Sequence, residues 1–159
     1  MRRKDREVVE IEEKVKIIDK CKVLRLAMIS DNRAYVVAMN FGYDIVDNRF
    51  VFYLHSATSG RKIDAIAVNP EVCIEMDREI CLVGDDEQAC EYSFSYESLI
   101  AEGRAEFITD VTRKIYALSL IMKHQTQSDV EFKFSKEAID KTCVIAINCD
   151  FVNAKKNIK

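Results

Sequence analysis

The segment FVFYLHSATSGRKIDAIAVNPEVCIEMD, residues 50–77, decides how the rest of the chain is interpreted. Residues 50–55 alternate between two sets of side chains, a pattern typical of a strand in a packed sheet. Small residues that favour a sharp turn follow at 56–60, and apolar side chains then recur at helical spacing. Asn69-Pro70 ends this helix because the residue before a proline avoids the α-helical conformation. The segment therefore predicts a strand, a tight loop and a short helix.

Two cations occupy the first turn of this predicted helix, which Thr58 or Ser59 is expected to cap. Arg61 and Lys62 lie where the helix dipole is already positive, and an exposed cation there costs roughly 0.3–1 kcal/mol. A bound anion would reverse the sign of that energy, as in the phosphate sites at helix N-termini. On these residues alone, an anion site and a solvated Arg-Lys pair on a loop both remain open.

Composition describes a globular protein. The chain has 159 residues, of which 48% are hydrophobic and 32% charged, and a net charge of −3. This length predicts one domain, residues 1–159. No apolar run approaches the roughly 18 residues that span a bilayer, and the basic start of the chain lacks the apolar core of a secretory signal. We therefore expect a cytoplasmic protein without membrane or nucleic-acid partners, with solubilising basic ends that include a tail at 150–159.

Six cysteines are spaced without a CxxC motif or another pattern of metal ligands. In a cytosolic chain such cysteines are usually small buried hydrophobic residues. We therefore expect neither a disulfide framework nor a structural zinc site.

The first part of the chain predicts a helix and a hairpin. Residues 5–20 place apolar side chains on one helical face, which indicates an amphipathic N-terminal helix. Residues 21–30 and 34–40 alternate as two strands around the turn Asp31-Asn32-Arg33. Residues 41–48 have a loop composition because they contain glycine, asparagine and two aspartates.

The middle of the chain predicts further strands at 72–77 and over the long region 90–108, with a short apolar segment at 80–83 that predicts no particular element. Counting by twos in the long region places a mostly aromatic set on one face, which is typical of a core. Its members are Tyr92, Phe94, Tyr96, Ser98 and Ile100. Ser98 interrupts this set with a hydroxyl that needs a partner if it is buried, and a ligand is one candidate.

Two more helices and a last strand complete the prediction. Asp110 and Ser135 are expected to cap helices, and residues 143–149 alternate as a strand. Strands that follow one another in hairpins favour a mainly β fold, a small antiparallel barrel with flanking helices, over a doubly wound sheet.

Four stretches together resemble the flavin-binding split-barrel proteins related to pyridoxamine-phosphate oxidase, most closely their nitroimidazole-resistance branch. They are CKVLRLAMISDNRAYVVAMNFGYD (21–44), HSATSGRKIDAIAVNPEVCIEMD (55–77), YESLIAEGRAEFITD (96–110) and the final apolar strand with its basic end. HSA followed by GRK before NP is the most specific mark. The resemblance implies an FMN-binding split β-barrel of the antiparallel Greek-key type.

The resemblance also implies a homodimer with FMN at the subunit interface. Arg61 and Lys62 match the pair that holds the flavin phosphate, and the strand from Tyr35 to Asn40 matches the one that passes the isoalloxazine edge. The implied cofactor-binding residues are Tyr35, Val37, Ala38, Met39, Asn40, His55, Ser56, Arg61, Lys62 and Ser98. His55 is assigned a catalytic place close to flavin and substrate, although a histidine at a strand end can instead simply bond a backbone carbonyl.

The function expected from this resemblance is an FMN-dependent oxidoreductase. It would take electrons from NAD(P)H or a similar donor and reduce a small acceptor, for example a nitroaromatic such as 5-nitroimidazole. A flavin-binding electron carrier or sensor without turnover is the main alternative. Haem binding through His55 or His124 is a weaker one. Pyridoxamine-phosphate oxidase activity itself is not expected, because the resemblance to that enzyme includes a further C-terminal segment that binds substrate. Ala154 stands where this branch usually has glycine, a departure that affects the expected C-terminal contact and not the expected fold.

Overall fold

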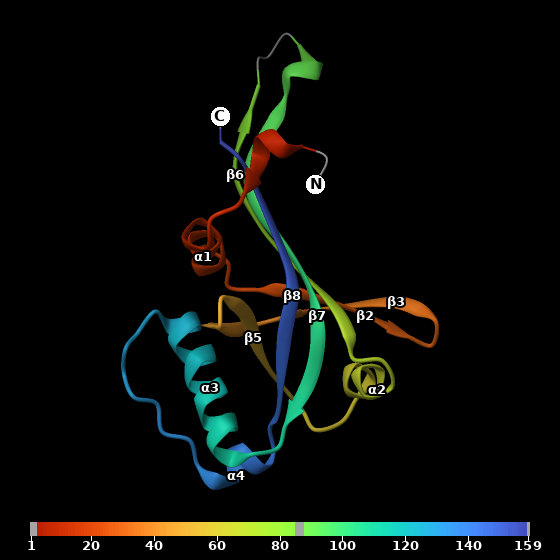
Figure 1. The fold of residues 1–159 in the computed structure, drawn as a ribbon, viewed down its shortest axis with the longest axis vertical. Helices are drawn as coiled ribbons and strands as arrows, with labels where there is room; N and C mark the ends of the chain where they lie inside the picture. Colours follow the sequence, from red (N-terminus) through yellow and green to blue (C-terminus); the bar gives the residue numbers. More distant parts are fainter. Residues whose placement is uncertain (1–2, 85–87, 159) are drawn as a thin grey trace.

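A computed structural model describes residues 3–84 and 88–158, which form a barrel-like antiparallel sheet with helices around it (Figure 1). The strands are β1 (Glu7–Val8), β2 (Leu24–Ser30), β3 (Arg33–Met39), β4 (Phe41–Val46), β5 (Arg49–Ser56), β6 (Glu71–Val83), β7 (Ser93–Ile108) and β8 (Cys143–Asn157). The helices are α1 (Ile11–Lys20), α2 (Arg61–Val68), α3 (Val111–Thr126) and α4 (Lys136–Asp140), with single 3-10 turns at Lys4–Arg6 and Ala89–Glu91. No helix in the described ranges is both long and apolar enough to cross a bilayer.

The strands lie in the order β3-β2-β6-β7-β8-β5-β4, and β1 pairs with β8. Every pairing is antiparallel. Three consecutive strands, β6, β7 and β8, are neighbours, and β5 lies beside β8 through the connection that contains α2, which is a Greek-key arrangement. The predicted antiparallel barrel with flanking helices is confirmed.

Two tight turns set the register of two hairpins, β2–β3 and β4–β5. Asp31 and Asn32 have φ of 54° and 56°, and Asp47 and Asn48 have φ of 50° and 62°. Asparagine and aspartate tolerate this left-handed conformation, which matches the twist of a two-residue hairpin. The predicted hairpin is confirmed, but the predicted loop at 41–48 is wrong, because all of it except the Asp47-Asn48 turn belongs to β4.

Three predicted boundaries also change. The N-terminal helix begins at Ile11 and not at residue 5, because residues 7–8 pair with β8. The strand predicted at 72–77 is longer than expected, because the apolar segment at 80–83 also belongs to β6. Most of the predicted tail at 150–159 is strand, because β8 continues to Asn157 between β7 and β1.

The caps predicted for α3 and α4 are confirmed. The Asp110 carboxylate accepts a hydrogen bond from the Arg113 N–H at 2.8 Å, and the Ser135 hydroxyl accepts one from the Ala138 N–H at 3.2 Å. These bonds satisfy amides that have no partner within their helices.

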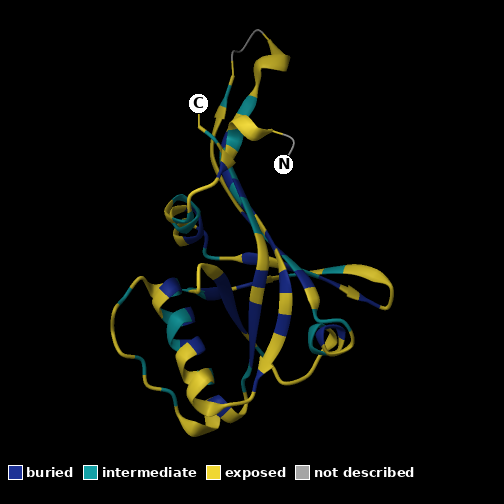
Figure 2. Cartoon of the chain, viewed as in Figure 1, coloured by how far each residue is buried: buried dark blue, intermediate teal, exposed yellow. Residues whose placement is uncertain are grey.

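The barrel interior holds the main core, and α3 covers a second cluster on the outer face of β5 and β8 (Figure 2). Phe41, Phe52 and Leu54 are fully buried in the main core. All six cysteines are free; two of them, Cys81 and Cys90, are exposed, so they are not core residues.

The face of β7 that points into the barrel is not the predicted aromatic one. Phe94 and Ile100 are 45% and 43% exposed, whereas Leu99 is completely buried. The inward face also carries Glu97, whose carboxylate accepts hydrogen bonds from Lys20 Nζ at 2.9 and 3.0 Å and lies 3.6 Å from Arg78. These ion pairs allow Glu97 to occupy the inner face of β7. The mostly aromatic set that includes Phe94 and Ile100 therefore lies on the outer face.

The contact between β4 and α3 depends on Gly42. A Cβ atom at this position would lie 2.4 Å from the backbone nitrogen of Ile121, so Gly42→Ala must push the helix away from the sheet. We expect this change to lower the free energy of unfolding by about 2 kcal/mol or more. Val46→Ala, at the exposed end of the same strand, should cost less than about 1 kcal/mol. Urea unfolding of both variants checks this, and equal losses would contradict the close approach.

Candidate functional site

The N-terminus of α2 has no side-chain cap. Gly60 is the N-cap residue with φ of 124°, a conformation that strains other residues, and no side chain bonds the first amides. The predicted cap by Thr58 or Ser59 is therefore wrong. The Gly60 carbonyl accepts the N–H groups of Ile63 and Asp64 at 2.8 and 3.1 Å. The amides of Arg61 and Lys62 have no acceptor within the helix, so they are available to a ligand.

Arg61 is held by contacts on two sides. Its Nε donates to Ser30 Oγ at 3.0 Å, and its guanidinium lies over the Tyr35 ring, 4.2 Å from the centroid. Ser30 is buried and its hydroxyl lies 3.3 Å from a carboxylate oxygen of Asp31. The terminal nitrogens of Arg61 form no hydrogen bond within the described residues. They are therefore free to bind an anion in a fork geometry.

Lys62 lies on the β8 side of the same helix end. Burial raises the pKa of the Cys143 thiol, and the charges of Lys114 and Lys62 oppose this rise, which places Lys62 within electrostatic reach of Cys143. Cys143 pairs across the strands with Ser56, and His55 pairs with Val144 one position along. The structure thus gathers the predicted residues Ser56 and Lys62 around one edge of the helix start, with an exposed His55 beside them.

A cavity of about 510 Å³ lies beside Arg61. Its lining includes Ser30, Asn32 and Asn69, and also the carboxylates of Asp31 and Asp64. Because Arg61 shares this cavity with two carboxylates, the charge of the lining does not favour an anion. The feature that favours an anion is instead the uncapped N-terminus of α2, whose first two residues are Arg61 and Lys62.

The other residues predicted to bind the cofactor along β3 differ in how far they are buried. Met39 is buried in the core and Val37 packs against it, while Ala38 and Asn40 are exposed. Asn40 donates to the Lys22 carbonyl and to Gln125 Oε1, both at 3.0 Å. The end of β3 is therefore tied to the end of α3.

Ser98 lies far from the helix end within one chain. It is half-buried on the outer face of β7, between Asp77 and Lys155 on the neighbouring strands. Arg104, six residues further along β7, pairs with Glu71 near the end of α2. Six residues of strand span about 20 Å. A single chain therefore does not bring Ser98 next to Arg61.

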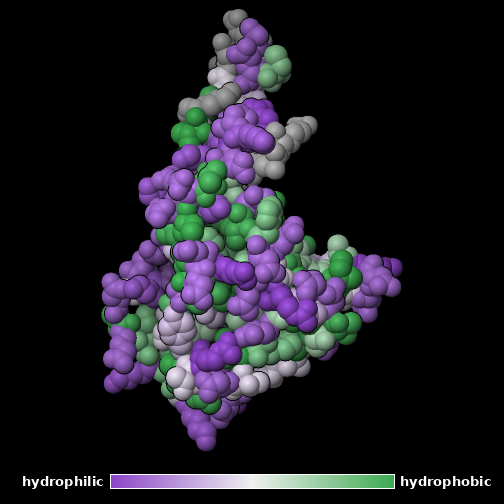
Figure 3. All heavy atoms as spheres, in the orientation of Figure 1, coloured by the Kyte–Doolittle hydropathy of each residue, from purple (hydrophilic) through white to green (hydrophobic). Residues whose placement is uncertain are grey.

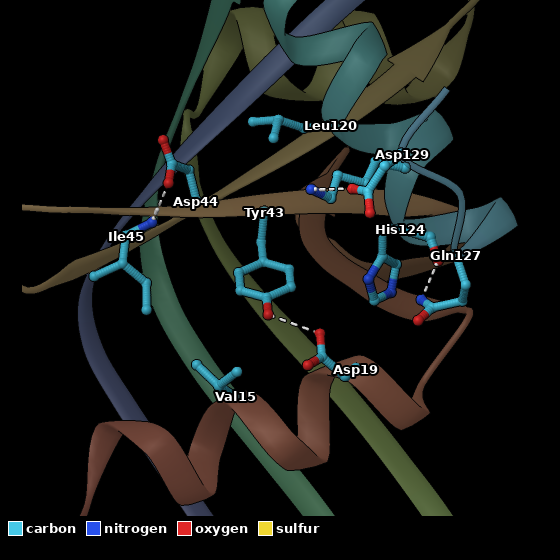
Figure 4. A pocket seen from close by; sticks show the side chains of 10 residues that line it. Val15, Asp19, Tyr43, Asp44, Ile45, Leu120, His124, Gln127 and Asp129 are labelled. Atoms are coloured by element: carbon cyan, nitrogen blue, oxygen red, sulfur yellow. Dashed lines mark hydrogen bonds and ion pairs between the residues drawn. The ribbon is translucent and has the colours of Figure 1, made fainter. Parts of the chain in front are cut away.

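A second cavity, of about 590 Å³, lies between α1, β4 and the end of α3 (Figure 4). Tyr43 and His124 line it, and sequence reasoning missed both. From its place on the last turn of a helix, His124 was expected to suit the helix C-terminus and to need no function. It is only 6% exposed, and its Nε2 lies 2.8 Å from the Cys21 carbonyl. The alternation Phe41, Tyr43, Ile45 was the available signal for an inward-facing strand at this place.

No group of three or more histidine, cysteine or acidic side chains in the described part of the chain is arranged to hold a metal ion.

Comparison with known proteins places this chain among flavin-related folds. The sequence pattern of the family described as pyridoxamine 5'-phosphate oxidase matches residues 10–156. A crystal structure from Bacteroides thetaiotaomicron, provisionally named a 5-nitroimidazole antibiotic resistance protein, is 31% identical. The alignment covers 94% of this chain and 85% of that one, with a TM-score of 0.80.

Two more distant structures share the fold. A flavocytochrome from Azotobacter vinelandii is 17% identical, with 100% of this chain and 72% of that one covered and a TM-score of 0.81. An FAD- and haem-binding protein from Mycobacterium smegmatis is also 17% identical, with 97% and 74% covered and a TM-score of 0.79. A comparison with curated proteins gave no match.

The buried His124 should make stability depend on pH. Burial lowers the pKa of His124 below its ordinary value of about 6.5, so the unfolded chain binds a proton more readily than the folded one. The stabilisation is complete above about pH 6.5 and is lost as the pH falls toward the folded pKa. We expect His124→Gln to flatten the decline in unfolding free energy between about pH 7.5 and 5, measured by urea unfolding. His55→Gln, at an exposed site, should keep the wild-type decline; an unchanged slope in His124→Gln would contradict the assignment.

Proposed function

The chain belongs to the pyridoxamine 5'-phosphate oxidase family, and we propose that it is an FMN-dependent oxidoreductase that reduces a small acceptor. The acceptor class we favour is a nitroaromatic such as a 5-nitroimidazole, with NAD(P)H or a similar donor as the source of electrons. The name of the 31% identical structure from Bacteroides thetaiotaomicron supports this choice of acceptor.

The main observation behind the proposal is that the N-terminus of α2 has no side-chain cap and begins with two cations, Arg61 and Lys62. A phosphate monoester is a dianion with several strong acceptor oxygens, and this helix end offers free amides together with Arg61 and Lys62. Ser30 and Tyr35 already hold the Arg61 side chain, so little conformational freedom is lost when the phosphate binds. We assign the flavin phosphate to this place.

FMN, once bound, would supply the electron-transfer chemistry, and the protein would supply position and surroundings. His55 is the last residue but one of β5, the strand that leads into the proposed phosphate loop, and its exposed imidazole is able to donate or accept a hydrogen bond. We assign His55 to contact with the acceptor or with the flavin.

We further propose that the site is completed by a second copy of the chain. The strand register aligns Val36, Ala27, Cys73, Glu102 and Phe151 in one row across β3, β2, β6, β7 and β8. The neighbouring row includes Ala38 and Ile100. Among these rows Val36, Ile100 and Phe151 are 55%, 43% and 51% exposed, and apolar side chains lie among polar ones over the long strands (Figure 3). A partner on this face would explain why Ser98 is distant from Arg61 in one chain.

The visible spectrum tests the cofactor and its use together. We expect purified protein supplied with FMN to show a bound-flavin spectrum that NAD(P)H bleaches and a 5-nitroimidazole restores. Protein that binds no flavin would refute the proposal. Tight flavin binding without turnover by these donors and acceptors would favour the carrier or sensor instead.

The phosphate assignment predicts a difference between two flavins. Arg61→Ala/Lys62→Ala should weaken FMN binding at least about 100-fold, because charged hydrogen bonds to phosphate are lost, while riboflavin affinity changes by less than about threefold. Titration calorimetry measures both. Arg49→Ala/Lys141→Ala removes two exposed cations elsewhere and should change neither affinity. Equal losses for FMN and riboflavin would contradict the assignment.

The interface assignment predicts that oligomerisation and flavin binding fail together. Ile100→Glu places a charge on the outer face of β7 and should convert a dimer to a monomer in sedimentation velocity, with weakened FMN binding. Val46→Glu changes a side chain of similar exposure, 47% against 43%, at the end of β4 and should leave the dimer intact. A wild-type monomer that binds FMN tightly would show that one chain suffices.

A further inference from the structure

The cavity between α1, β4 and the end of α3 has no role in the proposed flavin site. We propose that this cavity binds a small organic cation: an ammonium or amidinium group attached to an apolar body. The inference rests on the lining of the cavity alone and stands whether or not FMN binds at α2. Its volume of about 590 Å³ lies within the range of small-molecule sites.

The charge of the lining favours a cation. Three aspartates, Asp19, Asp44 and Asp129, line the cavity with one lysine, Lys123. The Lys123 ammonium is already paired with Asp129 at 2.6 Å. Two carboxylates therefore remain without a cation among the lining residues. FMN and NAD(P)H carry phosphates, which this lining would repel.

Asp19 offers an oriented carboxylate at the edge of the cavity. The Tyr43 hydroxyl donates to Asp19 Oδ1 at 2.7 Å, so one oxygen is fixed in place (Figure 4). Burial and the neighbouring carboxylate raise the pKa of Tyr43 well above its ordinary value, which keeps the phenol neutral and the bond formed. The second oxygen, Oδ2, accepts no hydrogen bond within the described residues and is available to an N–H donor.

His124 places a second acceptor inside the cavity. Its Nε2 faces the Cys21 carbonyl at 2.8 Å, and a carbonyl only accepts, so Nε2 carries the proton. Burial lowers the pKa of the ring, which leaves Nδ1 as an unprotonated acceptor. Nδ1 forms no hydrogen bond with any described residue. Every fully buried side-chain nitrogen or oxygen among the described residues does form a hydrogen bond, so Nδ1 is not fully buried. Nδ1 is therefore accessible from the cavity that His124 lines, between Tyr43 and Gln127 (Figure 4).

The rest of the lining suits an apolar body. Val15, Ile45 and Leu120 line the cavity together with the Tyr43 ring. The Tyr43 and His124 rings lie edge to face with centroids 5.7 Å apart, which fixes the shape of this wall. A ligand with its cationic end at Asp19 and His124 would bury its hydrocarbon part against these side chains.

Benzylammonium, benzoate and benzyl alcohol form a matched set of probes that differ in charge. The chain has two histidines, so the ring protons of His124 and His55 are resolved and assigned by NMR with the His55→Gln variant. We expect benzylammonium to shift the His124 ring signals in a saturable way and to leave those of His55 unchanged, while benzoate does neither. An unmoved His124 ring, or equal binding of benzoate, would overturn the proposal.

Asp19→Asn tests the charge without removing the contact to Tyr43, since the amide oxygen still accepts from the hydroxyl. Calorimetry should show at least a tenfold loss of benzylammonium affinity. Asp47→Asn removes the same charge in the exposed β4–β5 turn, where asparagine suits the backbone, and should bind as wild type. Unchanged binding by Asp19→Asn, or an equal loss in Asp47→Asn, would refute the site. FMN affinity, measured in parallel, keeps this result separate from the flavin proposal.

Discussion

The contact of the Arg61 guanidinium with Ser30 and Tyr35 is the interaction on which the candidate flavin site depends. A free arginine side chain loses up to about 2 kcal/mol of conformational entropy when a ligand fixes it, and here the fold has already fixed it. Ser30 and Tyr35 lie on the two strands of one hairpin, and the left-handed Asp31-Asn32 turn sets the register of those strands. This local turn thus determines the position in which the Arg61 guanidinium is held at the start of α2.

The same geometry is the reason for our proposal that a second chain completes the site. Arg61 and Lys62 lie together at the start of α2. Ser98 faces outward and lies about 20 Å along β7 from Arg104, whose partner Glu71 is near the end of α2. Strands β2 and β6 lie between β3 and β7 in the sheet and connect these two regions. The proposed homodimer would bury the outer face of these strands, and it would account for both the exposed apolar side chains there and the separation of the predicted residues.

Local sequence signals predicted the local features well. The strand, loop and helix of residues 50–77, the first hairpin and two helix caps all follow from turn chemistry and periodicity. The features that were missed depend on distant partners. Strand β4 contains loop-forming residues but is held by β5 and α3, and Glu97 occupies the inner face of β7 because Lys20 and Arg78 neutralise it. The burial of His124 likewise needs Cys21, far away in sequence, and no local pattern encodes such a pairing.

Phosphorus NMR of bound FMN tests the central claim most directly, because it observes the anion itself. A free phosphate monoester takes up its second proton near pH 6. If Arg61, Lys62 and the amides of α2 hold the phosphate, they stabilise the dianion, so the resonance of bound FMN should stay at the dianion position well below that pH. A bound flavin whose phosphate titrates like free FMN would show that the phosphate is in solvent, and would contradict the account.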